Sequence, residues 1–275
     1  MPIWLPALLL SVAEPLWLGP TPTTVHRVVS LAPSTTEILC AIDACDLLVG
    51  VTRYDESPEP VVRLPKVGGF NDPDPEAVLA LAPDLVLAVP TSGGRARVDA
   101  LARLGLSVLV VPAETLDDLW VAVDAVGTAV GRPAKGHELA QRLQTELAAL
   151  GERHRQDRRL RVLLLVGRRP LVAAGRGTFI DSLLLLLNAD NVVTRGGGFP
   201  VLDLEALVGL DPDVIIDAAF GESPEFMEFW SRARGVGAVS RGRVVELVDN
   251  AILRPGPRLA AGLEALGHAL RPEAR

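Results

Sequence analysis

The stretch PAKGHELAQRLQTELAALGERHRQ, residues 133–156, lies near the middle of the 275-residue chain. Its leucines recur at steps of four and three residues and so share one stripe of a helix: Leu139, Leu143, Leu147 and Leu150. Pro133 suits a first helical position, because its missing N–H would be unpaired there. A helix of about 24 residues is roughly 36 Å long, about twice the usual length. It is either a surface helix of one domain or a strut between two lobes.

The sequence on both sides of this stretch alternates between strand and helix patterns. Before it, strands are predicted from residue 27 and over 47–51, 85–89 and 107–111, and helices over 35–44, 74–82, 95–104 and 116–130. After it, strands are predicted over 161–166, 214–217 and 244–248, and helices over 178–187, 203–211, 225–232 and 258–270. Ser34 with Glu37 three residues later is typical of a capping box for the first of these helices. The alternation indicates mostly parallel sheets.

An internal repeat relates the two halves. Residues 74–87 read DPEAVLALAPDLVL, and residues 203–216 read DLEALVGLDPDVII. In both, a capping Asp, a Glu, an apolar stripe, a Pro-Asp break and a buried strand fall in the same register. The repeat favours two Rossmann-like α/β lobes over residues 25–130 and 157–275, joined by a backbone helix over residues 131–156.

The composition bounds the class of protein. The chain is 49% hydrophobic, so it can bury a sizeable core. Its formal net charge is −7, which argues against a general nucleic-acid binder, because such a protein would show a basic face. The sequence has no run of 18 apolar residues, so no ordinary membrane span is predicted. Residues 3–12 resemble the apolar part of a secretory signal, although no Lys or Arg precedes them and Glu14 interrupts the pattern. We expect residues 1–24 to be a signal or its remnant; a disordered leader or a misplaced start codon are the alternatives.

The cysteines and histidines show no metal-binding pattern. Cys40 and Cys45 form no CxxC motif, and we interpret them as buried free thiols, or as a local disulfide if the protein is exported. The four histidines are not paired at metal-ligand spacing: His26, His137, His154 and His268. Two of them, His137 and His154, lie on the strut and are expected to be solvated. We therefore expect no metal site and no intrinsic cofactor.

The order of several segments resembles the substrate-binding proteins of bacterial ABC importers for metal chelates, the group with a helical backbone between its lobes. Within that group the chain is most similar to cobalamin-binding proteins. The segments that carry the resemblance are residues 27–37, 49–54, 66–70, 76–87, 102–108, 188–192 and 205–216. It covers nearly everything after residue 25, and no single motif in it is decisive.

The resemblance implies a fold of the class III periplasmic-binding-protein type and a protein with no chemistry of its own. Such a protein would be a periplasmic or otherwise extracytoplasmic monomer that captures a corrinoid (cobalamin), or a related chelate such as haem or a ferric siderophore. Its partners would be the permease and the ATPase of the importer, and it would meet the membrane only through the permease. A two-lobed α/β enzyme using a nucleotide is the second hypothesis. The sequence disfavours it, because it holds no P-loop, no G-x-S-x-G elbow and no H-E-x-x-H motif.

Ligands of open α/β sheets bind beyond the carboxyl ends of the strands. Turns at such positions carry, in the first half, Ser34, Arg53, Tyr54, Gly69 and Phe70, and in the second half Arg168, Arg169, Phe199 and Asn250. Tyr54, the only tyrosine, is either a packed loop residue, an aromatic that stacks on a macrocycle, or a phenolate ligand to haem iron. By resemblance, Tyr54 and Phe70 fall where cobalamin binders place aromatics. Asn250-Ala251 departs from those binders, which often carry another aromatic there, so corrinoid ranks only narrowly before haem.

Glu76 and Glu205 occupy equivalent positions of the repeat. One interpretation is that each complements the positive end of its helix dipole. The resemblance implies another, in which the two glutamates dock onto arginines of the permease.

Overall fold

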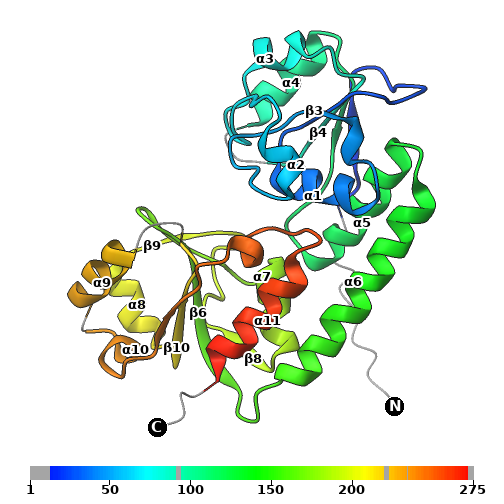
Figure 1. Cartoon of the computed structure of the whole chain (residues 1–275). Coiled ribbons are helices and arrows are strands. Elements are labelled where there is room, and N and C mark those ends of the chain that lie inside the picture. Colours follow the sequence, from blue (N-terminus) through cyan, green and yellow to red (C-terminus); the bar gives the residue numbers. More distant parts are fainter. Residues whose placement is uncertain (1–12, 91–93, 220–222, 234, 272–275) are drawn as a thin grey trace, which may run out of the picture.

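The structure is a computed structural model that describes residues 13–90, 94–219, 223–233 and 235–271. Two α/β lobes lie one above the other in Figure 1, and the long helix α6 (Pro133–His154) runs along one side. This confirms the predicted fold class of two lobes with mostly parallel sheets joined by a backbone helix. The apolar run over residues 3–12 lies outside the described residues. Among the described helices, none is both long and apolar enough to cross a membrane.

The first lobe has a five-stranded sheet in the order β1-β5-β4-β2-β3. Its strands are β1 (Leu16–Leu18), β2 (Val28–Ser30), β3 (Leu48–Gly50), β4 (Leu85–Ala88) and β5 (Val108–Val110). All neighbours are parallel except β1 and β5. The helices are α1 (Pro33–Ala41), α2 (Glu59–Val62), α3 (Pro75–Ala80), α4 (Arg95–Arg103) and α5 (Leu116–Ala129), with a 3-10 turn η1 (Cys45–Leu47).

Strand β1 lies within residues 1–24, for which a signal or leader stays a prediction. Trp17 pairs with Leu109 of β5 and packs, partly buried, against the core. Without β1, the edge of β5 would leave a row of backbone groups unpaired. The described part of this segment therefore belongs to the first lobe.

The second lobe has a sheet in the order β11-β10-β6-β7-β9, with β8 also paired to β6. Its strands are β6 (Leu160–Arg168), β7 (Leu171–Ala173), β8 (Ala189–Asn191), β9 (Val201–Leu202), β10 (Val214–Asp217) and β11 (Val244–Glu246). β7 runs antiparallel to β6 and β9, and was not predicted. The helices are α7 (Phe179–Leu186), α8 (Leu204–Leu210), α9 (Ser223–Arg232), α10 (Gly237–Ser240) and α11 (Leu259–Leu270), with a 3-10 turn η2 (Asn250–Leu253).

The repeated residues make the same contacts in both lobes, next to the strands that follow the Pro-Asp break. Asp74 and Asp203 cap α3 and α8 as predicted. Beyond the Pro-Asp break, Asp84 accepts the backbone N–H of Arg27 at 2.9 Å, and Asp213 accepts that of Arg161 at 2.9 Å. Both arginines also donate from Nη2 to a carbonyl at the C-terminal end of α3 or α8, at 2.7 Å in each lobe. The repeated residues thus join the end of α3 to the start of β2, and the end of α8 to the start of β6.

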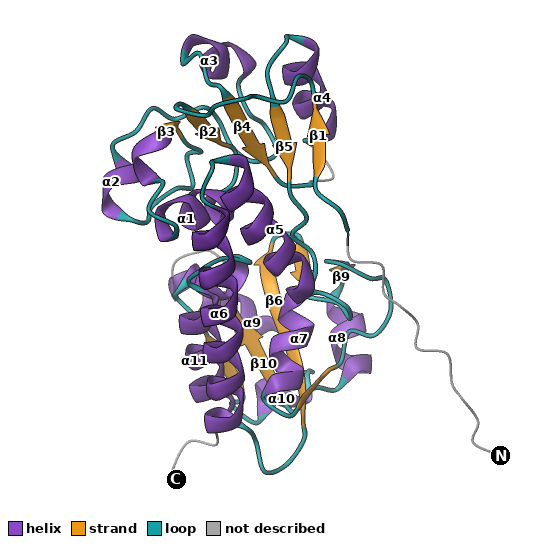
Figure 2. Cartoon of the chain, turned by 90° about the vertical axis from the view of Figure 1, so that its right-hand side faces the viewer, coloured by secondary structure: helices purple, strands orange, loops and turns teal. Residues whose placement is uncertain are grey.

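One hydrophobic core runs through both lobes and the strut. It joins buried side chains of α1 and β4 to α5, then to the predicted leucine stripe of α6, and on to α7, β6 and α11. Figure 2 shows α5 where the two lobes meet, and α6 running from there along the second lobe. Two smaller clusters cover the other faces of the sheets. The lobes are therefore connected by packing as well as by the chain.

Helix α1 differs from the prediction at its start. It begins at Pro33, and its N-cap, Ala32, provides no side-chain cap. Ser34 therefore lies inside the first turn, and the predicted capping box with Glu37 is wrong. A true capping box occurs at α5 instead, between Thr115 and Asp118.

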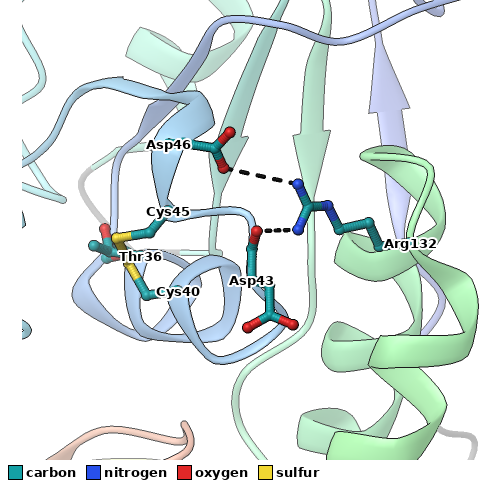
Figure 3. Close-up of a disulfide and its surroundings, with 7 residues drawn as sticks. Thr36, Cys40, Asp43, Cys45, Asp46 and Arg132 are labelled. Atoms are coloured by element: carbon teal, nitrogen blue, oxygen red, sulfur yellow. Dashed lines mark hydrogen bonds and ion pairs between the residues drawn. A yellow bond between two sulfur atoms is a disulfide. The ribbon is translucent and has the colours of Figure 1, made fainter.

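Cys40 and Cys45 form a disulfide, which corrects the favoured interpretation as free thiols. The bridge closes the turn between α1 and η1, where the two Cα atoms are 4.1 Å apart. Figure 3 shows Arg132, which precedes α6, reaching this turn: it donates to the carbonyl of Asp43 and lies 3.7 Å from the carboxylate of Asp46. The cross-linked turn therefore holds the start of the strut.

Candidate functional site

Tyr54 and Phe70 form an exposed aromatic pair on the first lobe. Their ring centroids are 5.6 Å apart, and the side chains keep 42% and 39% of their surface exposed. Tyr54 follows Thr52, whose hydroxyl lies 2.5 Å from a carboxylate oxygen of the buried Asp55. That hydrogen bond fixes the turn from which the tyrosine projects, so the exposed ring is attached to an ordered backbone.

Arg53 and Gly69 complete this cluster. The guanidinium of Arg53 lies 5.6 Å from the Tyr54 ring centroid and makes two hydrogen bonds with Asp72, of 3.1 and 2.8 Å. The hydrogen bond from Arg53 lowers the pKa of Asp72. A Cβ at position 69 would come within 3 Å of side-chain atoms of Arg53, Tyr54 and Asp72, so a larger residue there would displace these side chains. Four of the predicted site residues are thus brought together, and Asp72 is a contact that was not among the predicted residues.

An arginine cluster joins the two lobes beside Ser34. The buried Glu37 of α1 accepts a hydrogen bond of 3.4 Å from Arg254, and its carboxylate lies 3.7 Å from Arg258. Arg254 also donates to the backbone carbonyl of Tyr54 at 3.1 Å. Gly256, between these arginines, lies against Glu37 and Ser34, where a Cβ would make only ordinary contacts. Burial raises the pKa of Glu37, against the opposing field of the two arginines.

The sequence reasoning missed this cluster. Glu37 had a local explanation as part of a capping box, and its partner Arg254 lies 217 residues away. The remaining clue is the concentration of two arginines in residues 254–258, between the last strand and the last helix, in a stretch that itself holds no acidic residue.

Arg168 is buried inside an ion cluster. It ends β6 and contacts Asp217 at 2.8 Å and Glu246 at 3.0 Å, at the ends of β10 and β11. Trp230 donates to the same Asp217 at 2.8 Å. The side chain of Arg168 is only 6% exposed, so its charge is balanced within the lobe. Its Nη1 has no hydrogen-bond partner among the described residues, and a ligand contact there stays a prediction.

The other predicted residues of the second lobe do not form one cluster. Arg169 is exposed in the β6–β7 turn. The ring of Phe199 is 42% exposed, and its centroid lies 6.4 Å from that of Phe179. Asn250 begins η2 and accepts a 3.3 Å hydrogen bond from Arg258, which links it to the arginine cluster.

Glu76 and Glu205 lie in the first turns of α3 and α8 and are exposed. Because Asp74 and Asp203 satisfy the backbone N–H groups there, the glutamates are not needed as caps. This leaves both carboxylates available to a partner protein.

A hollow of about 940 Å³ lies elsewhere on the first lobe. It separates the segment around Trp17 and His26 from α5. No predicted ligand-binding residue lines it.

The family model described as "periplasmic binding protein" matches residues 28–251. An uncharacterised ABC transporter substrate-binding lipoprotein of Bacillus subtilis (strain 168) is 32% identical over 257 residues, which cover 90% of this chain and 80% of that protein. The vitamin B12-binding protein of Salmonella typhi is 29% identical over 266 residues, covering 96% of this chain and 95% of that one.

Solved structures show the same fold. A periplasmic heme-binding protein from Pseudomonas aeruginosa matches with a TM-score of 0.79 and 27% identity, covering 91% of this chain and 94% of that chain. The periplasmic vitamin B12-binding protein of Vibrio cholerae matches with a TM-score of 0.77 and 23% identity, covering 90% and 96%.

Proposed function

The chain belongs to the periplasmic binding protein family, and on that premise we propose that it is the substrate-binding component of an ABC importer. It captures a corrinoid such as cobalamin, or a related metal chelate, and delivers it to the membrane permease. The observation that carries the ligand class is the similarity to a vitamin B12-binding protein over nearly the whole of both chains. The family is one of transport proteins and not a class of enzymes.

The exposed aromatic pair supports a flat ligand. A corrin ring offers a broad surface to Tyr54 and Phe70, and offset or tilted aromatic contacts add to the burial of apolar area. The paired Arg53 keeps its charge at the edge of this surface, where polar groups on the rim of a chelate can accept hydrogen bonds.

Haem is the second candidate. A heme-binding protein is among the most similar solved structures, at 27% identity. A tyrosine phenolate is an established haem iron ligand, and Tyr54 is exposed and is the only tyrosine of the chain. The absence of a further aromatic at Asn250 and Ala251 leaves this candidate open.

The proposed location is extracytoplasmic. The Cys40–Cys45 disulfide supports this, because such bonds persist in oxidising compartments. The exposed Glu76 and Glu205, one on each lobe, support docking to a permease with two equivalent sites.

The test is direct binding of defined ligands. The protein is incubated separately with cyanocobalamin, haem and a ferric hydroxamate, freed of unbound ligand, and its absorption spectrum is recorded. We expect one equivalent of corrinoid to be retained, and titration calorimetry to give saturable binding. Tight haem binding with no corrinoid binding would change the ligand to haem and the role of Tyr54 to iron ligation. Retention of none of the three would refute the ligand class.

A further inference from the structure

Three potential metal ligands meet where the strut ends against the last helix. His154 is the last residue of α6, and Glu264 and His268 lie one turn apart on α11. One ligand atom from each lies within 4.8 Å of the others. In Figure 1 these lower ends of α6 and α11 lie side by side, away from the first lobe that carries Tyr54.

His154 is built into this junction, contrary to the expectation that it is solvated. It is 2% exposed, and its ring centroid lies 4.7 Å from that of His268. Gly267 makes room for it, because a Cβ at that position would lie 2.5 Å from the Cβ of His154. Nδ1 lies 3.3 Å from Nη2 of Arg271, while Nε2 is buried and has no hydrogen-bond partner among the described residues. A buried polar atom without a partner calls for an explanation, and the binding of an ion is one.

We propose that His154, Glu264 and His268 bind a divalent transition-metal ion of the Zn²⁺ type. Two imidazole nitrogens with one carboxylate oxygen suit zinc, nickel or copper, whereas magnesium and calcium require oxygen ligands. Metal bonds of about 2.0–2.1 Å with tetrahedral angles need ligand atoms roughly 3.3 Å apart. Glu264 and His268 are exposed, so their side chains can close the present spacing around an ion from solvent. The fourth position is left to water.

Two nearby cations oppose metal binding. Arg271 contacts Nδ1 of His154, and Nη1 of Arg153 lies 3.8 Å from the carboxylate of Glu264. Both arginines are exposed, so each can turn toward solvent when an ion enters. Removing Arg271 should therefore strengthen metal binding, which non-specific adsorption to surface carboxylates would not show.

The ion would link the end of the strut to the last helix of the second lobe. Since it binds the folded chain and joins two helices, it should stabilise the fold by mass action. This role is independent of the chelate bound near Tyr54.

The experiment uses the full chain without an affinity tag, treated with a chelator and then titrated with ZnCl₂ by calorimetry. We expect one equivalent of Zn²⁺ to bind and to raise Tm, and Mg²⁺ to have no effect. His268→Ala and Glu264→Gln change exposed residues and should weaken Zn²⁺ binding at least tenfold, and Arg271→Ala should strengthen it. His137→Ala is the control. His137 is exposed on α6, the helix that ends at His154, and this variant should bind Zn²⁺ as the parent does.

Co²⁺ provides a second readout, since a tetrahedral site gives visible absorption bands that should be lost in His268→Ala. The absence of one-equivalent binding, or equal binding by His268→Ala and the parent, would overturn the proposal.

Discussion

At the scale of single residues, the candidate site depends on Tyr54 and on what fixes it. The hydrogen bond between Thr52 and Asp55 shapes the turn, and Arg254 from the other lobe holds the backbone carbonyl of Tyr54. Tyr54 keeps 42% of its surface exposed, although Phe70 and the Arg53 guanidinium both lie beside its ring. The backbone of Tyr54 is therefore held in place by residues of both lobes.

Tyr54→Ala should reduce corrinoid affinity at least tenfold, about 1.4 kcal/mol, because it removes one ring of the pair. Tyr54→Phe is the matched control, since it keeps the ring and loses only the hydroxyl. Calorimetric titration of the parent and the two variants separates stacking from iron ligation. If Tyr54 stacks on the ligand, Tyr54→Phe should bind as the parent does. If Tyr54→Phe and Tyr54→Ala lose haem binding equally, the phenolate is an iron ligand. Unchanged corrinoid affinity in the Ala variant would remove Tyr54 from the site.

Glu37 should give the stability of the protein a defined pH dependence. Burial raises its pKa, so between its ordinary value and the raised one the folded state holds the proton more tightly than the unfolded state. The contribution of Glu37 is thus present at low pH and is lost as pH rises through this window. Glu37→Gln cannot ionise. The difference in unfolding free energy, parent minus variant, should therefore fall as pH rises above the ordinary pKa of a glutamate.

Urea unfolding at several pH values measures this difference. The control is Glu138→Gln on the exposed side of α6, for which the difference should not follow the same course. A difference for Glu37→Gln that grows with pH would show that pairing with Arg254 and Arg258, and not burial, dominates.

At the scale of elements, the disulfide and the strut are linked. The Cys40–Cys45 bridge closes a turn whose carbonyl oxygens accept hydrogen bonds from Arg132, next to the first residue of α6. The same turn connects α1, which carries Glu37, to β3. Its order therefore matters for both the first lobe and its attachment.

Replacing both cysteines by Ala should lower the free energy of unfolding by about 2 kcal/mol, because the bridge restricts a short loop of the unfolded chain. A reducing agent should lower the parent to the same value and leave the variant unchanged. Chemical denaturation with and without the agent checks this. If reduction leaves the stability of the parent unaltered, the bridge does not contribute to the fold.

The equivalent helices α3 and α8 carry the proposed docking residues. The double variant Glu76→Gln and Glu205→Gln should keep ligand affinity, because neither residue belongs to the aromatic cluster or the arginine cluster. Transport by the reconstituted importer should fall, since the negative charges that would meet the permease are gone. Asp99→Asn, on the exposed helix α4, is a control for net charge. Transport by the double variant at the rate of the parent would exclude the docking role.

At the scale of the whole molecule, the two lobes share one core. Side chains of α5, α6, α7 and α11 form a continuous cluster that includes residues of both lobes, and the contacts of Glu37 with Arg254 and Arg258 cross between them. A large hinge motion would separate packed apolar surfaces and bend a continuous helix. Both changes are costly, since a bend breaks backbone hydrogen bonds of the helix.

We expect the lobes to shift only slightly when ligand binds. Small-angle scattering curves of the free and the loaded protein should nearly overlay, with equal radii of gyration within error. A lysozyme-sized rigid protein measured in the same buffers controls for interparticle effects. A clear contraction on loading would show that the shared core yields.

The sequence by itself determined the elements that depend on near neighbours. The leucine stripe of α6, the caps at Asp74 and Asp203, and the repeat that places them in two lobes are all encoded within a few residues. The same local logic found Tyr54 and Phe70, because both follow predicted strands or turns, although their ring contact could not be derived.

Only the tertiary structure decided which residues meet across the chain. It paired Glu37 with Arg254, neutralised Arg168 with Asp217 and Glu246, added β1 to the first sheet, and placed His154 beside His268. A local pattern such as Ser34 with Glu37 has two possible outcomes, a cap or a distant ion pair. The choice depends on whether packing brings an opposite charge close enough to offset the burial of the carboxylate, and that depends on the fold of the whole chain.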